Sequence, residues 1–276
     1  MIQYRLVYAY YVGDEFTIIH KVHLLLLQMY INIFDNVDFI LLINDNTNVE
    51  ETKNLILSYL NRDDINFVIR NNDSFYREGI IYKEFIVDKL NDYKENELVF
   101  FGHTKGVTNG LNKKYLDNTI VWISLMYWCN LNKPYLIDYE LIEKDNICFG
   151  AIYNYDSSNI TKYHWQYAGS FQWINPKRLY ELTKDNNKEF RDFNIKVIAE
   201  QFLGNNVSPE YAAFTNHTVF NKYHSLLLYD SHDYIYSNVW YAAYCMMAID
   251  DTYEFINFLE TTNILRFCEN ETSNDI

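Results

Sequence analysis

The sequence predicts an α/β protein built on a mostly parallel central sheet that is flanked by helices. Strand-like and helix-like segments alternate through the first hundred residues, and the second and fourth of the expected strands are almost entirely apolar. Fully apolar strands are typical of parallel sheets, because helices cover both faces of such a sheet. No Gly-, Ser- or Pro-rich tract separates two halves, so residues 1–276 are expected to form a single fused domain.

The order of the expected elements divides the chain into a regular half and a mixed half. The first half has strands at 5–11, 37–43, 65–69 and 98–101, with helices at 16–33, 47–60 and 79–90 between them. The second half has a helix at 118–129, a strand at 147–155, a mixed apolar segment at 167–174 and a helix at 177–182. Pro176 opens the last helix, since its fixed backbone angle suits a first turn. A parallel half is therefore followed by a mixed, aromatic half.

The composition excludes several classes of protein. A net charge of −14 without a polybasic stretch argues against nucleic acid and anionic membrane as partners. The apolar run 23–30 is too short to span a bilayer, and the N-terminus has no signal-peptide pattern. We therefore expect a cytoplasmic protein with no integral membrane segment. The cysteines form no zinc or disulfide pattern and are expected to be reduced: Cys129, Cys148, Cys245 and Cys268.

Polar side chains follow each of the four expected parallel strands. They occur at 14–15, 44–46, 70–73 and 103–105, and the carboxyl ends of parallel strands are where open α/β sheets bind ligands. Helix capping explains such residues equally well for 44–46. The cluster at 103–105 favours a functional interpretation, because Lys105-Gly106 opens no evident helix. The glycine-rich motifs of dehydrogenases and P-loop proteins and the nucleophile elbow of hydrolases are missing.

Three segments, in order, resemble one family of proteins. Residues 101–107 (FGHTKGV) resemble the "YFHTKGV" segment of glycosyltransferase-like proteins with the GT-A fold, which are distantly similar to rhamnan-synthesis transferases. Residues 167–174 (YAGSFQWI) are similar to the "YSGNFWWA" segment of that group, and 199–204 (AEQFLG) to its "AExW" segment. Trp122 and Met126 match a helix between them. Ser170 and Gln172 replace the usual Asn and Trp, and no match follows residue 206.

The resemblance implies a GT-A-type glycosyltransferase that moves a sugar from a nucleotide sugar to a glycan or polysaccharide acceptor, such as a surface glycan. The nucleotide would be UDP, GDP or dTDP. The donor half would span about 1–110, and the acceptor half with the C-terminal helices about 111–276. The expected donor-binding residues are Tyr10, Asp45, Arg70, His103, Thr104 and Lys105. The expected acceptor-binding residues are Trp165, Gly169, Ser170 and Trp173, because sugar faces stack on Trp and small residues allow close approach.

The chemistry of transfer assigns further roles. A departing diphosphate needs charge compensation, which an Asp-x-Asp motif with bound Mn²⁺ or Mg²⁺ usually provides. That motif is missing at the fourth strand end, so either His103 ligates a metal or Lys105 neutralises the diphosphate without one. An inverting reaction also needs a carboxylate to deprotonate the acceptor, and Glu200 is the candidate. Glu78 and Glu84 both lie near the third loop, and the sequence leaves open which of them, if either, faces the donor.

Two alternatives of other kinds remain. The first is a non-catalytic carbohydrate- or nucleotide-binding module that keeps the fold without the chemistry, as the missing Asp-x-Asp motif suggests. The second is another Rossmann-like transferase, such as a methyltransferase, which the lack of a glycine-rich loop after the first strand disfavours.

Overall fold

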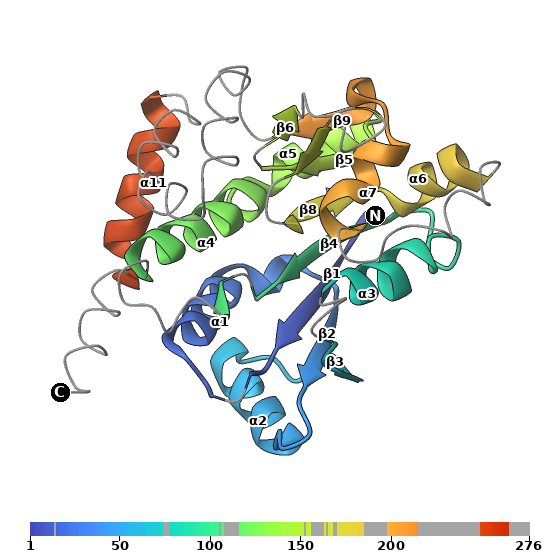
Figure 1. The fold of residues 1–276 in the computed structure, drawn as a ribbon. Coiled ribbons are helices and arrows are strands. Elements are labelled where there is room, and N and C mark those ends of the chain that lie inside the picture. Colours follow the sequence, from blue (N-terminus) through green and yellow to red (C-terminus); the bar gives the residue numbers. More distant parts are fainter. Residues whose placement is uncertain are drawn as a thin grey trace.

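A computed structural model of the chain provides the fold (Figure 1). Most of the first 151 residues and several later segments are described, with a gap at 215–248. The described residues are 1–13, 15–73, 78–104, 106–107, 116–151, 153–155, 163, 165–167, 170–184, 198–214 and 249–264.

One seven-stranded sheet contains strands from both halves of the sequence. Its order is β3-β2-β1-β4-β8-β5-β9, and β3, β2, β1 and β4 are parallel to one another. β8 is antiparallel to both of its neighbours, and β5 pairs with β9 in parallel. The predicted mostly parallel α/β class is thus confirmed. The strands are β1 (Gln3–Tyr11), β2 (Asn36–Ile43), β3 (Ile65–Asn71), β4 (Glu97–His103), β5 (Cys148–Gly150), β8 (Gln172–Ile174) and β9 (Ala212–Phe214).

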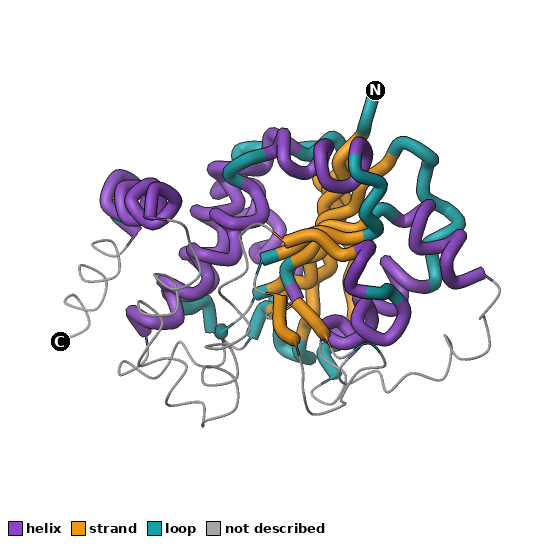
Figure 2. Tube along the Cα trace, turned by 90° about the horizontal axis from the view of Figure 1, so that it is seen from above, coloured by secondary structure: helices purple, strands orange, loops and turns teal. Residues whose placement is uncertain are grey.

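Helices cover both faces of the sheet, which Figure 2 shows from above. One face packs against α1 (Ile18–Tyr30), α2 (Val49–Leu60) and α4 (Leu116–Leu131), and the other against α3 (Glu78–Tyr82), α6 (Pro176–Thr183) and α7 (Ile198–Asn206). Because side chains alternate along a strand, β1 sends Tyr8 and Tyr10 to the first face and Val7 and Ala9 to the second. Two buried cores result, one on each side of the sheet.

The remaining elements refine the predicted boundaries. The helix expected at 79–90 begins as α3 and continues as the π-helical segment η2 (Lys83–Val87). The single strand expected at 147–155 is divided: β5 joins the main sheet, and β6 (Tyr153–Tyr155) pairs antiparallel with β7 (Trp165–Tyr167) in a small second sheet. The other elements are η1 (Ile31–Ile33), α5 (Pro134–Asp138), η5 (Tyr139–Glu143), η9 (Pro209–Tyr211) and α11 (Ile249–Thr261). Among the described residues, no helix combines the length and the apolarity needed to cross a bilayer.

Arg5 is the centre of an ion cluster at the amino end of the sheet. Its Nη1 lies 2.7 Å from Asp38 Oδ2, and its Nε lies 2.6 Å from Glu97 Oε1. Asn66 Nδ2 donates to the other oxygen of Asp38 at 2.7 Å. Burying a carboxylate is costly unless it is paired, so the cluster satisfies Asp38 and Glu97 while it joins β1, β2 and β4. The charges of this cluster are paired with one another at the amino edge. The candidate site described below lies at the opposite, carboxyl edge of the sheet.

Candidate functional site

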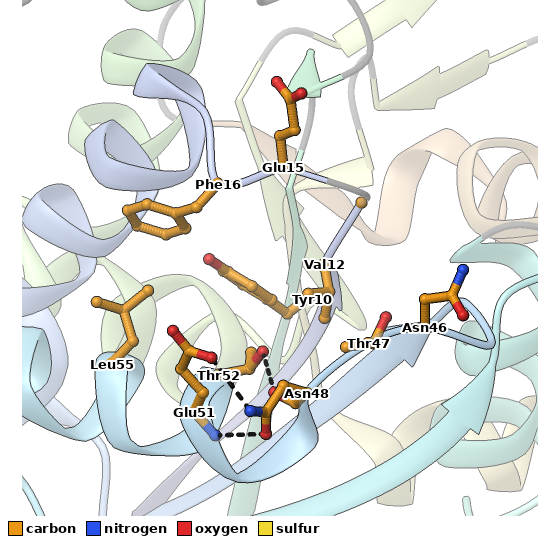
Figure 3. A pocket seen from close by; sticks show the side chains of 11 residues that line it. Tyr10, Val12, Glu15, Phe16, Asn46, Thr47, Asn48, Glu51, Thr52 and Leu55 are labelled. Carbon is orange, nitrogen blue, oxygen red and sulfur yellow. Dashed lines mark hydrogen bonds between the residues drawn. The ribbon is translucent and has the colours of Figure 1, made fainter.

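A cavity of about 420 Å³ opens at the carboxyl ends of β1 and β2. Its volume is within the range of roughly 300–1,000 Å³ that is usual for small-molecule sites. The first wall comes from the end of β1 and the loop that leads into α1 (Figure 3). It consists of Tyr10, Val12, Gly13, Glu15 and Phe16.

The second wall comes from the loop after β2 and the first turns of α2. Asn48 caps this helix: its Oδ1 accepts from the backbone N–H of Glu51 at 3.2 Å, and its Nδ2 donates to Glu51 Oε2 at 3.1 Å. Thr52 Oγ1 donates to the carbonyl of Asn48 at 2.9 Å. These bonds fix the start of the helix, as in other capped helices. The wall consists of Asn46, Thr47, Asn48, Glu51, Thr52 and Leu55.

His20 holds the first wall in place from beneath. The backbone N–H of Thr17 donates to His20 Nδ1 at 3.0 Å, so the proton of the ring is on Nε2, which donates to the carbonyl of Tyr11 at 2.8 Å. The ring of Phe16 is stacked on the imidazole, with centroids 5.5 Å apart. Burial lowers the pKa of His20 to about 4. The imidazole is therefore neutral at physiological pH, and both of its nitrogens serve the loop between β1 and α1.

Tyr10 brings an unusual polar group to the floor of the cavity. Its side chain is only 1% exposed, and its hydroxyl has no hydrogen-bond partner among the described residues. In Figure 3 the ring lies across the cavity, with the hydroxyl on the side of Phe16 and Leu55. Burial raises the pKa of this hydroxyl, so the group stays protonated. An unpartnered buried hydroxyl is costly, and such a group in a cavity is a candidate for contact with a ligand.

A second group of polar side chains lies at the ends of β1 and β4. The connections from these two adjacent strands lead in opposite directions along the sheet, which makes their carboxyl ends a topological switch point. His103 ends β4 there, and its Nδ1 lies 4.0 Å from Glu78 Oε1 of α3. Its ring centroid is 5.6 Å from that of Phe171. Of the two carboxylates left open by the sequence, the structure thus brings Glu78 to His103.

Thr104 links the same two strand ends. Its backbone N–H donates to the carbonyl of Ala9 at 3.1 Å, and its Oγ1 accepts from the backbone N–H of Tyr11 at 2.9 Å. The hydroxyl oxygen of Thr104 is therefore bonded to the backbone at the sheet edge. Lys105, which follows it, lies outside the described residues.

Neither Asp45 nor Arg70, both predicted to bind the donor, is among the residues that line the cavity. Asp45 is exposed in the turn after β2, and its neighbours Asn46 and Thr47 line the cavity in its place. Arg70 Nε lies 2.9 Å from Glu84 Oε2, so this guanidinium is directed toward η2 on the other face of the sheet. The loops that follow β2 and β3 are neighbours, because Asn72 Nδ2 donates to Asn44 Oδ1 at 3.2 Å. Of the predicted donor-binding residues that the structure describes, Tyr10 is the one that lines the cavity.

The two tryptophans predicted to bind an acceptor are core residues. Both are 0% exposed; the Nε1 of Trp165 donates to the carbonyl of Val207, and that of Trp173 to the carbonyl of Asn130. A sugar therefore has no free ring face on which to stack, in contrast to the expectation from sequence. Packing against segments distant in the sequence buries both rings, and no local pattern reports that.

Ser170, which is also predicted to bind the acceptor, is buried and has a strained backbone. Its φ is 57°, in the left-handed region that non-glycine residues rarely adopt, and its Oγ has no hydrogen-bond partner in the described part of the chain. Such strain is concentrated at functional sites. Glu200 lies in α7, but its side chain is outside the described residues, as is Gly169 altogether.

A divalent cation would find few ligands among the described residues. No three His, Cys, Asp or Glu side chains come together there; His103 and Glu78 form a pair, with Nδ1 and Oε1 4.0 Å apart. Mg²⁺ is commonly held by one or two carboxylates together with substrate phosphates. This donor set would fit such an ion only with a phosphate supplied by the substrate.

Comparison with known proteins assigns no family to the chain. No protein-family model matches the sequence, and no curated protein matches it. The site therefore has to be interpreted from its own geometry. That geometry includes Glu51, Phe16 and His20, which sequence reasoning missed; the Asn48-x-x-Glu51 spacing signals a helix start, and nothing in it signals a cavity.

Proposed function

We propose that the chain is a nucleotide-sugar-dependent glycosyltransferase of the GT-A type, which transfers a sugar to a glycan acceptor. The observation that carries the proposal is the cavity at the carboxyl ends of β1 and β2, on the same sheet edge as His103 at the switch point between β1 and β4. Open α/β sheets bind nucleotides at such an edge. The parallel half and the mixed half share one sheet, in agreement with one fused domain that holds donor and acceptor side by side.

The charges at the site support one orientation of the donor. Glu15 and Glu51 are the charged residues among those that line the cavity, so a diphosphate in it would be repelled. The nucleoside, which is uncharged, suits the cavity better. The diphosphate would then extend over the end of β1 toward His103 and Lys105, the candidate cationic groups of the 103–105 cluster. A Mn²⁺ or Mg²⁺ ion bound through the phosphates and His103 stays part of the proposal, as does compensation by Lys105 without a metal.

The roles on the acceptor side follow from the sequence and from Ser170. We assign the general base to Glu200 and the acceptor pocket to the Gly169-Ser170 edge. The unpartnered Oγ and the strained backbone of Ser170 support this edge as a contact for the acceptor, about where His103 meets Phe171. Trp165 and Trp173 have no part in it, because both are buried.

The second candidate is a nucleotide-binding module without transfer activity. It is favoured by the missing Asp-x-Asp motif at the end of β4 and by the few metal donors that the described residues gather there. Both candidates require a nucleotide in the cavity, so they differ only in whether a nucleoside diphosphate is released from its sugar.

A thermal-shift screen with UDP-, GDP- and dTDP-linked hexoses, with and without Mn²⁺, tests the shared requirement. A donor at ~100 times its dissociation constant stabilises the fold by roughly 2.7 kcal/mol. Release of nucleoside diphosphate in the presence of a mixture of glycans then separates the enzyme from the module. If none of the donors raises the melting temperature, the proposed donor site is wrong.

Lys105→Ala tests the placement of the diphosphate. We expect weaker nucleotide binding with a nearly unchanged melting temperature. Lys144→Ala is the matched control, because Lys144 directly follows η5 and this part of the chain lies at the other edge of the sheet. Asp138, which ends α5 just before η5, accepts a hydrogen bond from Tyr4 at the amino edge. Equal affinities of the Lys105 variant and the wild type would remove Lys105 from the site.

A further inference from the structure

We propose that the cavity selects a ribonucleoside over a 2′-deoxyribonucleoside, with Glu51 as the acceptor for the ribose hydroxyls and Tyr10 as a second polar contact. This inference rests on the proposed function. It limits the donor to UDP- or GDP-linked sugars and excludes dTDP-linked sugars, whose nucleoside lacks the 2′-hydroxyl. Three observations carry it: the exposed Glu51 carboxylate is bonded by Asn48 through Oε2 alone, the hydroxyl of Tyr10 has no hydrogen-bond partner, and the described residues that line the cavity include no Lys, Arg or His.

Glu51 is held so that one of its carboxylate oxygens remains available. Asn48 binds both the backbone N–H and Oε2 of Glu51, which fixes the side chain against the start of α2. No described residue donates a hydrogen bond to Oε1. Figure 3 shows the carboxylate beneath the Tyr10 ring, with its second oxygen directed away from Asn48. The helix start is thus already capped, and the free oxygen faces the space where a ligand would lie.

Tyr10 is an independent indication that a polar ligand belongs here. It comes from β1 and not from α2, it is 1% exposed, and its hydroxyl lacks a partner within the described residues. Leaving a buried hydroxyl unpaired costs stability that a purely structural residue, such as phenylalanine, would not cost. A ligand atom that bonds this hydroxyl would offset the cost.

The chemistry of the cavity distinguishes a sugar diol from a phosphate. A carboxylate only accepts hydrogen bonds, and a vicinal diol offers two O–H donors to it. A phosphate offers negatively charged oxygens, which Glu15 and Glu51 would repel. An acidic residue that bonds the ribose is also the arrangement by which other nucleotide-binding sheets recognise this sugar. Loss of the 2′-hydroxyl removes one donor to a charged acceptor, so the affinity should fall by about 10- to 100-fold.

Calorimetric titration of the full chain with UDP, dUDP, GDP and dGDP tests the inference without any substitution. We expect at least one ribonucleotide to bind about 10-fold or more tightly than its deoxy form. In Glu51→Gln and Glu51→Ala the preference should shrink to about 3-fold or less, because the charged acceptor is lost. Glu50→Gln is the matched control: Glu50 is the adjacent residue, it pairs with Lys53 at 2.8 Å, and it does not line the cavity. This variant should keep the full preference.

Tyr10→Phe separates a binding role from a structural one. It removes a hydroxyl that has no partner in the described residues, so the melting temperature without nucleotide should stay equal or rise while the affinity for the ribonucleotide falls. An unaltered affinity, or a loss of stability without nucleotide, would overturn the role of Tyr10. Equal binding of ribo and deoxy forms by the wild type, or a preference that survives in both Glu51 variants, overturns the inference and leaves the proposed function intact. If no nucleoside diphosphate binds, both are overturned.

Discussion

Replacement of His20 by glutamine tests the buried imidazole beneath the cavity wall. The ring is 0% exposed, and burial lowers its pKa from 6.5 to about 4. Between these two values the unfolded chain binds a proton that the folded chain does not bind. The free energy of unfolding therefore falls as the pH is lowered through this window. Protonation of His20 causes no loss of stability above about pH 6.5, and the loss is complete below about pH 4.

The structure sets the size of this effect. A pKa difference of about 2.5 units at about 1.36 kcal/mol per unit corresponds to roughly 3 kcal/mol, a large part of the stability of an ordinary domain. Glutamine at position 20 can donate to the carbonyl of Tyr11 but does not titrate. We expect His20→Gln to be less stable at neutral pH, because one amide replaces two well-placed ring nitrogens. Its stability should also fall less steeply with acid.

Urea unfolding followed by tryptophan fluorescence at several pH values from 7 to 4 measures the difference. Carboxylates elsewhere contribute equally to the wild type and the variant, so the quantity of interest is the difference between their losses. The wild type should lose roughly 3 kcal/mol more than His20→Gln between pH 6.5 and 4. If both proteins lose the same amount, the imidazole is not held neutral by burial, and the account of the first wall is wrong.

Three further predictions concern the fold and the reaction. Arg5→Met leaves Asp38 and Glu97 without their cation and should lower the free energy of unfolding in urea by roughly 3–5 kcal/mol, whereas Lys53→Met, at the exposed pair with Glu50, should cost about 1 kcal/mol or less. Gly106→Ala should lower the melting temperature for two reasons: φ is 83°, and the new Cβ would lie 2.6 Å from Thr119 Cγ2. Adding Thr119→Ser removes that methyl group, so it should restore only the part of the lost melting temperature that the clash causes. Glu200→Gln should reduce turnover by ~10²-fold or more with donor binding intact, and near-normal turnover would point to a retaining mechanism or to another carboxylate.

Local patterns were sufficient to predict the sheet edge that carries the site. The apolar strands and the polar residues that follow them are encoded within short windows, so the strand predicted at 37–43 ends where β2 ends, and the strand predicted at 98–101 lies within β4, which continues to His103. A parallel sheet then brings these ends to one edge, because every strand points in the same direction. Tyr10 was predicted as a ligand contact, and it does line the cavity.

The partners of individual side chains could not be predicted in the same way. Arg70 pairs with Glu84 fourteen residues further on, and only the position of η2 decides that contact. The indole N–H groups of Trp165 and Trp173 donate to the carbonyls of Val207 and Asn130, which lie more than forty residues away. Aromatic residues suit both a core and a sugar platform, so their identity alone did not distinguish the two. The burial of a side chain depends on the whole fold.

The hydrogen bonds of Thr104 constrain which residues this position accepts. Its hydroxyl accepts from the N–H of Tyr11, so valine, which has the same shape, would leave that donor without its acceptor, while serine would keep the bond. The sheet therefore sets the chemical identity of the residue after His103. In a related chain, a hydroxyl residue that follows this histidine would mark a shared way of closing the edge between β1 and β4.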